Sequence, residues 1–116
     1  MKIQKTLTIA DVVQDHVVIH FVPAHIRNQS DVERVAAEID EVADSYAFKM
    51  MVLNFSRVKS MTSAFLGKIV RLNNALKARK IALRACSMNG AVEECFKLVK
   101  LQKLVPLFKS EKEAIR

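Results

Sequence analysis

The sequence is poor in the residues that several classes of site require. Its 116 residues include two glycines, two prolines, two cysteines, one tyrosine and no tryptophan. Two isolated glycines, Gly67 and Gly90, do not make the glycine-rich loop that binds nucleotide phosphates. Cys86 and Cys95 are not a C-x-x-C pair, and two cysteines do not form a disulfide framework. Nucleotide-binding loops, disulfide scaffolds and cysteine-based zinc sites are therefore not predicted.

Long apolar runs are also absent. No run approaches the roughly 20 residues that span a bilayer, and the polar-interrupted start, MKIQKTLTIADVV, lacks a signal-peptide cleavage site. Apolar residues nevertheless make up 51% of the chain. A chain of this length buries roughly two thirds of its unfolded surface, which suffices for its own core. We therefore expect one domain over residues 1–116, in the cytoplasm and without membrane insertion.

The histidines do not form a recognisable catalytic or metal-binding set. His16, His20 and His25 are spaced by four and five residues, in a segment that reads as a hairpin followed by a loop. No further ligands accompany them, and no Ser-His-acid set can be assembled around them. We therefore expect a protein that is not an enzyme and that holds no metal and no cofactor.

Positive charge is concentrated in the second half of the chain. The formal net charge is +7; residues 59–116 hold thirteen Lys or Arg and four Asp or Glu, whereas residues 1–58 hold six and eight. Such a surface attracts nucleic acid, an anionic membrane or an acidic protein, and it is equally typical of an ordinary solvated face. The shortage of aromatic residues argues against specific nucleic-acid binding, which relies on stacking platforms.

The first segment of the chain has the pattern of a β-hairpin. Thr6–Ala10 alternates in polarity and Val17–Val22 is rich in β-branched residues, with a turn predicted at Asp15 and His16. Pro23 ends the second strand, because proline cannot donate a hydrogen bond to the sheet.

An amphipathic helix follows a loop at Ala24–Gln29. Ser30 and Glu33 match a capping box, and the helix is expected to continue to about Asp44. The apolar residues that recur at helical spacing are Val32, Val35, Ala36, Ile39, Val42 and Ala43.

The segment from Met50 to Ala78 is the centre of the pattern. Met50–Phe55 is apolar without alternation, as expected of a central strand that is covered on both faces. A polar connector, Ser56–Thr62, leads into a second helix, whose apolar face consists of Phe65, Ile69, Leu72 and Leu76. The connector therefore joins a buried strand to a helix and contains several hydroxyl groups at the junction.

The remainder continues the alternation. Ile81–Cys86 is a predicted strand, Asn89 opens a third helix, and Leu101–Phe108 is a connector with a weak strand signal. Ser110 and Glu113 form a second capping box before a short terminal helix. This order predicts an α/β fold: a small mixed, largely parallel sheet with an N-terminal hairpin and about four helices packed on it. Partners of such sheets bind at the carboxyl ends of the strands, where the Ser56–Thr62 connector is expected.

Two segments resemble a known family: MVLNFSRVKSMTSAFLGKIVRLNNALKARKIALRACS and, after it, LVKLQKLVPLFKSEKEAI. Their order and spacing resemble the STAS domain (sulfate transporter and anti-sigma factor antagonist), and most of all its free-standing bacterial anti-sigma factor antagonists. The family pattern is an apolar strand ending in Asp, followed by an Asp-Ser-Ser-Gly-like tetrad that opens a helix. The resemblance covers residues 50–116 well and residues 1–49 in outline.

Carried over position by position, the resemblance implies the following roles. Asn54 stands in the place of the strand-ending Asp, and Thr62 in that of the tetrad's Asp. Ser63 occupies the place of the phosphorylated Ser, Ala64 that of the second Ser and Phe65 that of the Gly. The implied phosphoacceptor is therefore Ser63, with Thr62 as a second candidate.

The resemblance implies a partner-switching function. An unphosphorylated antagonist binds an anti-sigma factor, usually a serine kinase of the histidine-kinase-like ATPase fold, and phosphorylation ends that binding. The residues that we expect at the partner surface are Asn54, Ser60, Thr62, Ser63, Phe65, Lys68 and Arg71.

Structural roles compete with this interpretation at several positions. Thr62 or Ser63 would serve equally as a helix cap, Phe65 as a core residue, and Lys68 and Arg71 as solvated helix residues. One alternative function is a STAS-like subunit that binds a transporter or lipid-handling ATPase constitutively. The other is nucleic-acid binding through the basic half, and a homodimer is left open.

Overall fold

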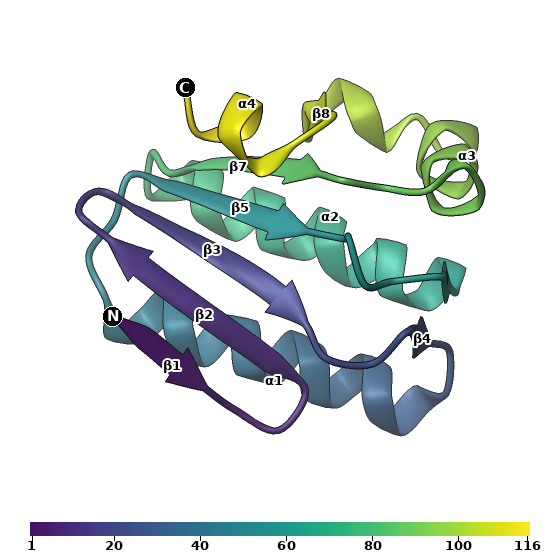
Figure 1. Cartoon of the computed structure of the whole chain (residues 1–116), viewed down its shortest axis with the longest axis horizontal. Helices are drawn as coiled ribbons and strands as arrows, with labels where there is room; N and C mark the ends of the chain where they lie inside the picture. The colour runs from purple at the N-terminus through teal and green to yellow at the C-terminus, as the bar shows by residue number, and fades with distance from the viewer.

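The computed structural model describes all 116 residues and is built around one six-stranded sheet with the strand order β1-β2-β3-β5-β7-β8 (Figure 1). These strands are β1 (Lys2–Gln4), β2 (Thr8–Val13), β3 (His16–Phe21), β5 (Met50–Asn54), β7 (Ala82–Cys86) and β8 (Leu107–Phe108). The four α-helices are α1 (Gln29–Ser45), α2 (Ser63–Ala78), α3 (Gly90–Leu98) and α4 (Glu111–Ile115), with a 3₁₀ turn at Leu101–Lys103. The predicted α/β class and the order of the four helices and the longer strands are confirmed.

Strand direction divides the sheet into two parts. β1, β2 and β3 are antiparallel, and β3, β5, β7 and β8 are parallel to one another. The predicted hairpin is present, but its two-residue turn is Gln14–Asp15, one position earlier than expected, and Val13 pairs with His16. The pairing register of β2 and β3 decides the position of the turn, because a slip by one residue would move the buried side chains of β3 to the other face of the sheet.

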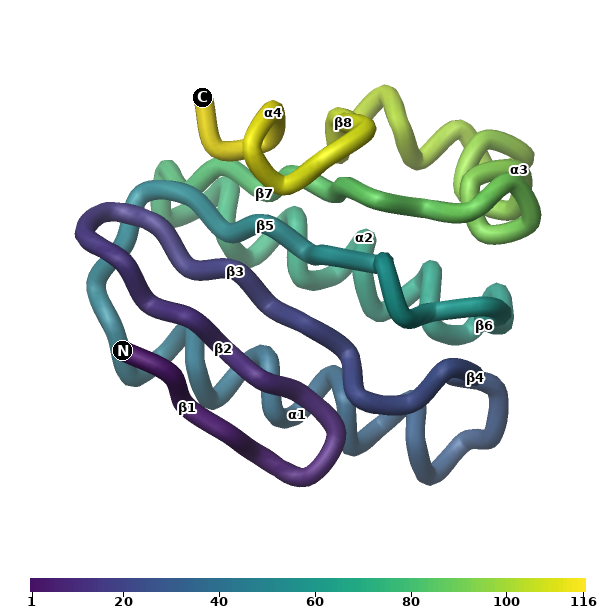
Figure 2. The backbone as a smooth tube through the Cα atoms, in the orientation of Figure 1, coloured from purple at the N-terminus to yellow at the C-terminus, as the bar shows by residue number.

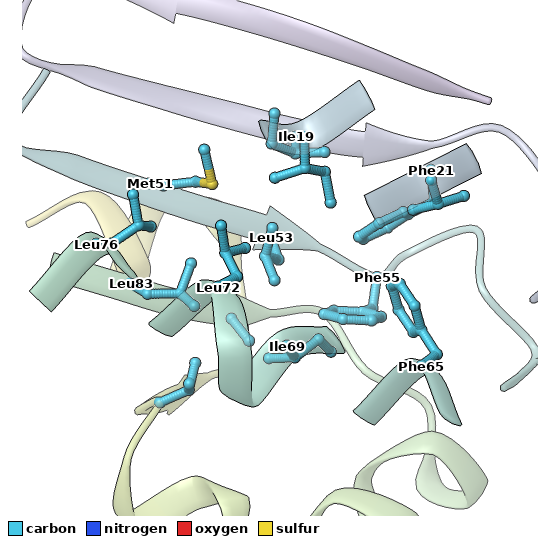
Figure 3. Packing of buried hydrophobic residues seen from close by; sticks show 14 of the residues in the cluster. Ile19, Phe21, Met51, Leu53, Phe55, Phe65, Ile69, Leu72, Leu76 and Leu83 are labelled. Carbon is cyan, nitrogen blue, oxygen red and sulfur yellow. The ribbon is translucent and has the colours of Figure 1, made fainter. Parts of the chain in front are cut away.

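Helices cover both faces of the sheet and create two apolar clusters. α1 and α2 lie along one face and α4 lies on the other (Figure 1). Met51 and Leu53 of β5 contribute to the large core beneath α1 and α2, part of which is shown in Figure 3. Val52 points the other way, into a small cluster with Ala114 of α4. Burial on both faces explains why the apolar run in β5 does not alternate with polar residues.

The caps of the helices agree only in part with the sequence prediction. Ser30 does not cap α1: the N-cap is Asn28, whose Oδ1 accepts a hydrogen bond from the N–H of Asp31 at 2.8 Å. Ser30 lies within the first turn because asparagine two residues earlier already satisfies a free N–H group. Ser110 does cap α4, since its hydroxyl accepts a bond from the N–H of Glu113 at 3.2 Å.

Three short strands were not predicted: β4 (His25–Ile26) and β6 (Ser60–Met61) lie in segments predicted as a loop and a connector, and β1 lies in a segment with no prediction. β1 precedes the hairpin, while β4 and β6 form a separate parallel pair beyond the ends of the sheet strands (Figure 2). Strands of two or three residues contain no measurable periodicity, so the sequence pattern does not reveal them. None of the helices combines the length and apolar composition needed to cross a membrane.

Candidate partner-binding site

The connector between β5 and α2, residues 55–62, follows Asn54, the last residue of β5, whose side chain is held inside the protein by hydrogen bonds. Asn54 is 7% exposed. Its Oδ1 accepts a hydrogen bond from the N–H of Ser56 at 2.9 Å, and its Nδ2 donates to Oε1 of Glu111 at 2.9 Å. Asn54 was expected at the partner surface; the structure corrects this, because both ends of its amide are engaged internally. Its role is to position the start of the connector.

The middle of the connector is held by the β4–β6 pair. The carbonyl of Ala24 accepts hydrogen bonds from the N–H groups of Lys59 and Ser60, at 2.6 and 3.2 Å. Oγ of the half-buried Ser60 lies 2.6 Å from Nδ1 of the exposed His25. Sequence reasoning considered His25 as a metal ligand and as a member of a Ser-His-acid set, and it missed this contact. The two residues are 35 positions apart, and nothing in the local pattern signals their pairing.

A third support comes from the N-cap of α3. Oδ1 of Asn89 accepts a bond from the N–H of Val92 at 2.8 Å, and its Nδ2 donates to the carbonyl of Val58 at 3.2 Å. One amide side chain therefore caps α3 and ties that helix to the connector. A loop held at three separate points presents a defined surface and loses little conformational entropy when a partner binds.

Four phenylalanines form an aromatic cluster that includes both ends of the connector. Phe21 and Phe55 have ring centroids 4.9 Å apart, Phe21 and Phe65 are 5.8 Å apart at 90°, and Phe55 and Phe96 are 6.5 Å apart. Figure 3 shows the first three together at the end of the core. Phe65 is 1% exposed. It is a core residue, and the interpretation as an exposed docking anchor is wrong.

The hydroxyl groups at the start of α2 differ sharply in exposure. Thr62 occupies the N-cap, yet its side chain makes no capping hydrogen bond, and its Oγ1 is buried without a partner. Ser63 is the first helical residue and is exposed. Neither hydroxyl therefore caps the helix, and of the two residues only Ser63 is exposed.

The first turn of α2 is suited to negative charge. It contains no acidic residue. The N–H groups of Ser63 and Ala64 have no carbonyl partner within the helix, and the helix dipole places partial positive charge there. A phosphate on the exposed hydroxyl would therefore be compatible with the fold.

The two predicted basic residues face α1 instead of the connector. Lys68 is half-buried and its Nζ lies 3.0 Å from Oε2 of Glu33. Arg71 is exposed and, with Lys68, lines a groove of about 480 Å³ between α1 and α2 that also contains Asp40. Loss of hydration there, with the like charge of Asp44, raises the pKa of Asp40, and the two cations oppose this effect. Much of their charge is thus directed at the acids of α1.

The remaining titratable residues form neither a metal site nor a reactive thiol centre. No group of three or more His, Cys, Asp or Glu lies close enough to hold a metal ion. Cys86 is buried, and burial is the main cause that raises the pKa of its thiol, while a hydrogen bond with Ser87 opposes the rise and the charge of Glu111 adds to it. A thiol with a raised pKa remains protonated and unreactive.

Comparison with known proteins decides the family. The sequence matches the family model of the STAS domain over residues 9–114, which is nearly the whole chain. The chain belongs to the STAS domain family. No curated protein sequence matches this STAS domain significantly.

Solved structures with the same fold include several antagonists. The anti-sigma factor antagonist SpoIIAA in its unphosphorylated form is 22% identical, with a TM-score of 0.76, covering 93% of this chain and 92% of that one. The Bacillus cell fate determinant SpoIIAA in its phosphorylated form is 21% identical, with a TM-score of 0.70, covering 93% of this chain and 96% of that one. An anti-sigma-factor antagonist (STAS) domain protein from Planctomyces limnophilus is 19% identical, with a TM-score of 0.80 and 93% coverage of both chains.

A transporter-related protein shares the fold as well. A sulfate transporter family protein from Wolinella succinogenes is 12% identical, with a TM-score of 0.73, covering 90% of this chain and 84% of that one. At such identities the likeness establishes the STAS fold, which was predicted from the sequence, and leaves the function to be argued from the site.

Proposed function

We propose that this STAS domain, over residues 1–116, is a cytoplasmic, non-catalytic binding module of the anti-sigma factor antagonist type. In this proposal it binds an anti-sigma factor or serine kinase when unphosphorylated and is released when Ser63 is phosphorylated. The observation that carries the proposal is the exposure of Ser63 at the start of α2, directly after a connector that is anchored at three points.

The physical consequence of phosphorylation follows from this position. A phosphate adds about −1.5 to −2 charge and strong hydrogen-bond acceptors. The free N–H groups of the first turn accommodate that charge within the domain, so the fold is retained. A docked partner would instead meet a charged group inside its interface. A penalty of about 3 kcal/mol weakens binding about 100-fold, which is enough for a switch.

Residues near Ser63 differ from the family pattern, and these differences bear on how a kinase would recognise the site. Thr62 replaces the Asp of the tetrad, and its hydroxyl is buried. Phe65 replaces the Gly of the tetrad and packs in the core. Neither replacement covers Ser63, which remains exposed. This supports Ser63 as the phosphoacceptor and disfavours Thr62, because a kinase cannot reach a hydroxyl without exposed surface.

A second candidate is a STAS subunit that binds a transporter or lipid-handling ATPase constitutively. Two observations favour it: the family's Asp and Gly beside the phosphoacceptor are lost, and the fold is shared with a sulfate transporter family protein. The two candidates differ in one measurable property, which is the dependence of partner binding on charge at position 63.

The test is a pull-down from the source cell with four forms of the full chain: wild type, Ser63→Ala, Ser63→Asp and Ser45→Asp. Ser45 is a matched control because it is an exposed serine at the C-terminal end of α1, outside the connector. Phosphorylation-regulated binding predicts one partner that is retained by wild type, Ser63→Ala and Ser45→Asp and lost with Ser63→Asp. Identical partners for all four forms would instead support the constitutive subunit. Intact mass after incubation with the captured kinase then shows whether one phosphate is added.

A further inference from the structure

Exposed apolar side chains gather at one short turn of the chain. Of the six large apolar residues that are exposed, three lie within residues 98–104: Leu98 is 75% exposed, Val99 53% and Leu104 49%. The others, Met1, Val13 and Val22, are scattered singly, which is normal for a protein surface. A local cluster of exposed apolar side chains is typical of an interaction site.

Local geometry holds these side chains outward. α3 ends at Leu98, and Lys100 adopts a left-handed conformation with φ 57° before the 3₁₀ turn. Leu101 and Val105 are buried in the core and are linked by a hydrogen bond of 2.9 Å from the N–H of Val105 to the carbonyl of Leu101. Between and before these two anchors, Leu98, Val99, Lys100, Lys103 and Leu104 are exposed, whereas Gln102 is half-buried.

Lysines occur at every third position among the apolar residues of this turn. We call residues 97–104, with Lys97, Lys100 and Lys103, the basic-apolar turn. Lys97 forms an ion pair with Glu93 at 3.1 Å, whereas Lys100 and Lys103 have no ion-pair partner within 4.0 Å. No acidic residue occurs between positions 94 and 111. The turn is therefore both apolar and positively charged.

We propose that the basic-apolar turn docks on the surface of an anionic lipid bilayer. Aliphatic side chains enter the boundary between headgroups and acyl chains, while lysines beside them contact anionic headgroups. The turn lies at the periphery of the molecule, between α3 and β8 (Figure 1). The bilayer is favoured as the occupant because its anionic headgroups complement a turn that carries three lysines and no acidic residue. The excess of basic residues over 59–116 adds long-range attraction.

Sedimentation of the full chain with vesicles tests the proposal, at about 0.1 M salt, where charges are screened beyond about 10 Å. Vesicles of phosphatidylcholine with phosphatidylglycerol are compared with vesicles of phosphatidylcholine alone. We expect the protein to sediment with the mixed vesicles only. Absence of sedimentation with the mixed vesicles, or equal sedimentation with both, would overturn the proposal.

Two double variants separate the apolar and the charged contributions. Leu98→Ser with Leu104→Ser keeps every charge and is expected to weaken binding at least about tenfold. Lys100→Gln with Lys103→Gln is expected to weaken it about 25-fold, because each lysine near an anionic surface contributes about fivefold. Matched controls are Val13→Ser with Val22→Ser and Lys77→Gln with Lys80→Gln, which alter exposed residues elsewhere and should change binding about twofold or less.

Two results would assign the turn another role. Undiminished binding by Leu98→Ser with Leu104→Ser, or an equal loss in the control variants, would reduce the attraction to nonspecific charge and overturn the proposal. Self-association of the wild type that the same leucine variant abolishes, measured by analytical ultracentrifugation without vesicles, would assign the turn to a second copy of the chain. Circular dichroism confirms that each variant is folded before it is compared.

Discussion

Asn54 donates a hydrogen bond from Nδ2 to Oε1 of Glu111 at 2.9 Å, although the two residues are 57 positions apart. The same carboxylate oxygen lies 3.6 Å from Nε2 of His20. The other end of the Asn54 amide accepts the N–H of Ser56. The family pattern has Asp at this position, and an ionised Asp would place two carboxylates in contact. Asparagine therefore suits this position better than aspartate, because its amide can donate a hydrogen bond to the glutamate of α4.

Asn54→Asp is expected to lower the free energy of unfolding by about 2 kcal/mol at neutral pH. The variant loses the donor to Glu111 and brings two negative charges together in a partly buried site. Urea denaturation measures the change. Adding Glu111→Gln should restore most of the loss, because the glutamine amide then donates to the aspartate. A double variant no more stable than Asn54→Asp alone would contradict this account.

Thr62→Val is expected to leave the free energy of unfolding unchanged or to raise it by about 1 kcal/mol. The substitution removes a buried hydroxyl that has no hydrogen-bond partner, while it keeps the volume of the side chain. Asn89→Ala is the contrasting variant and should lose about 1–2 kcal/mol, since its amide makes a true cap and holds Val58. Thermal or urea unfolding distinguishes them. A loss of about 1 kcal/mol with Thr62→Val would show that the hydroxyl is engaged after all.

Phe65→Ala is expected to lower the free energy of unfolding by about 3–5 kcal/mol. Phe65 is 1% exposed and packs edge-on against Phe21, so the substitution creates a cavity beneath the start of α2. Phe65→Leu, which fills most of the space, should lose about 1.5 kcal/mol or less. Chemical denaturation of the two variants gives both values. Near-wild-type stability of Phe65→Ala would mean that the ring is not part of the core.

Gly67→Ala is expected to raise the free energy of unfolding by about 0.5–1 kcal/mol. Gly67 lies within α2, and a Cβ added there meets no atom within 4 Å. Alanine therefore restricts the unfolded chain without a steric penalty in the helix. Gly90→Ala, at the first residue of α3, should give a smaller gain, since helix propensity matters less at a terminus. The midpoints of thermal unfolding report both gains, and a loss with Gly67→Ala would point to an unrecognised close contact.

Asp40→Asn is expected to stabilise the protein at neutral pH. The pKa of Asp40 in the folded state is raised, chiefly by loss of hydration, so the folded state binds this proton more tightly than the unfolded chain does. Proton binding by Asp40 therefore adds to the free energy of unfolding at pH values below 3.8, the ordinary pKa of the carboxyl. This stabilisation is lost as the pH rises through the raised pKa of the folded state. The advantage of the variant should therefore grow with pH and then level off. Urea unfolding over a pH series measures it, and an advantage that shrinks as the pH rises would contradict the assignment.

The sequence alone determined the order of the helices and the longer strands, the central position of β5 and the hydroxyl group at the β5–α2 junction. These features depend on local periodicity: a run of apolar residues without alternation, helical spacing of apolar side chains, and caps such as Ser110. Each of these features can be predicted from the preferences of residues that are close together in the sequence. The family was identified from the same local order of motifs.

Tertiary structure decided how each site residue is used. The exposure of Ser63, the burial of Phe65 and of the Thr62 hydroxyl, and the internal role of Asn54 all follow from packing against elements distant in the chain. The contacts of Asn54 with Glu111 and of Ser60 with His25 span 57 and 35 residues. The register of the parallel strands and the packing of α4 against the sheet bring these side chains together. Local residue patterns specify neither the register nor the packing.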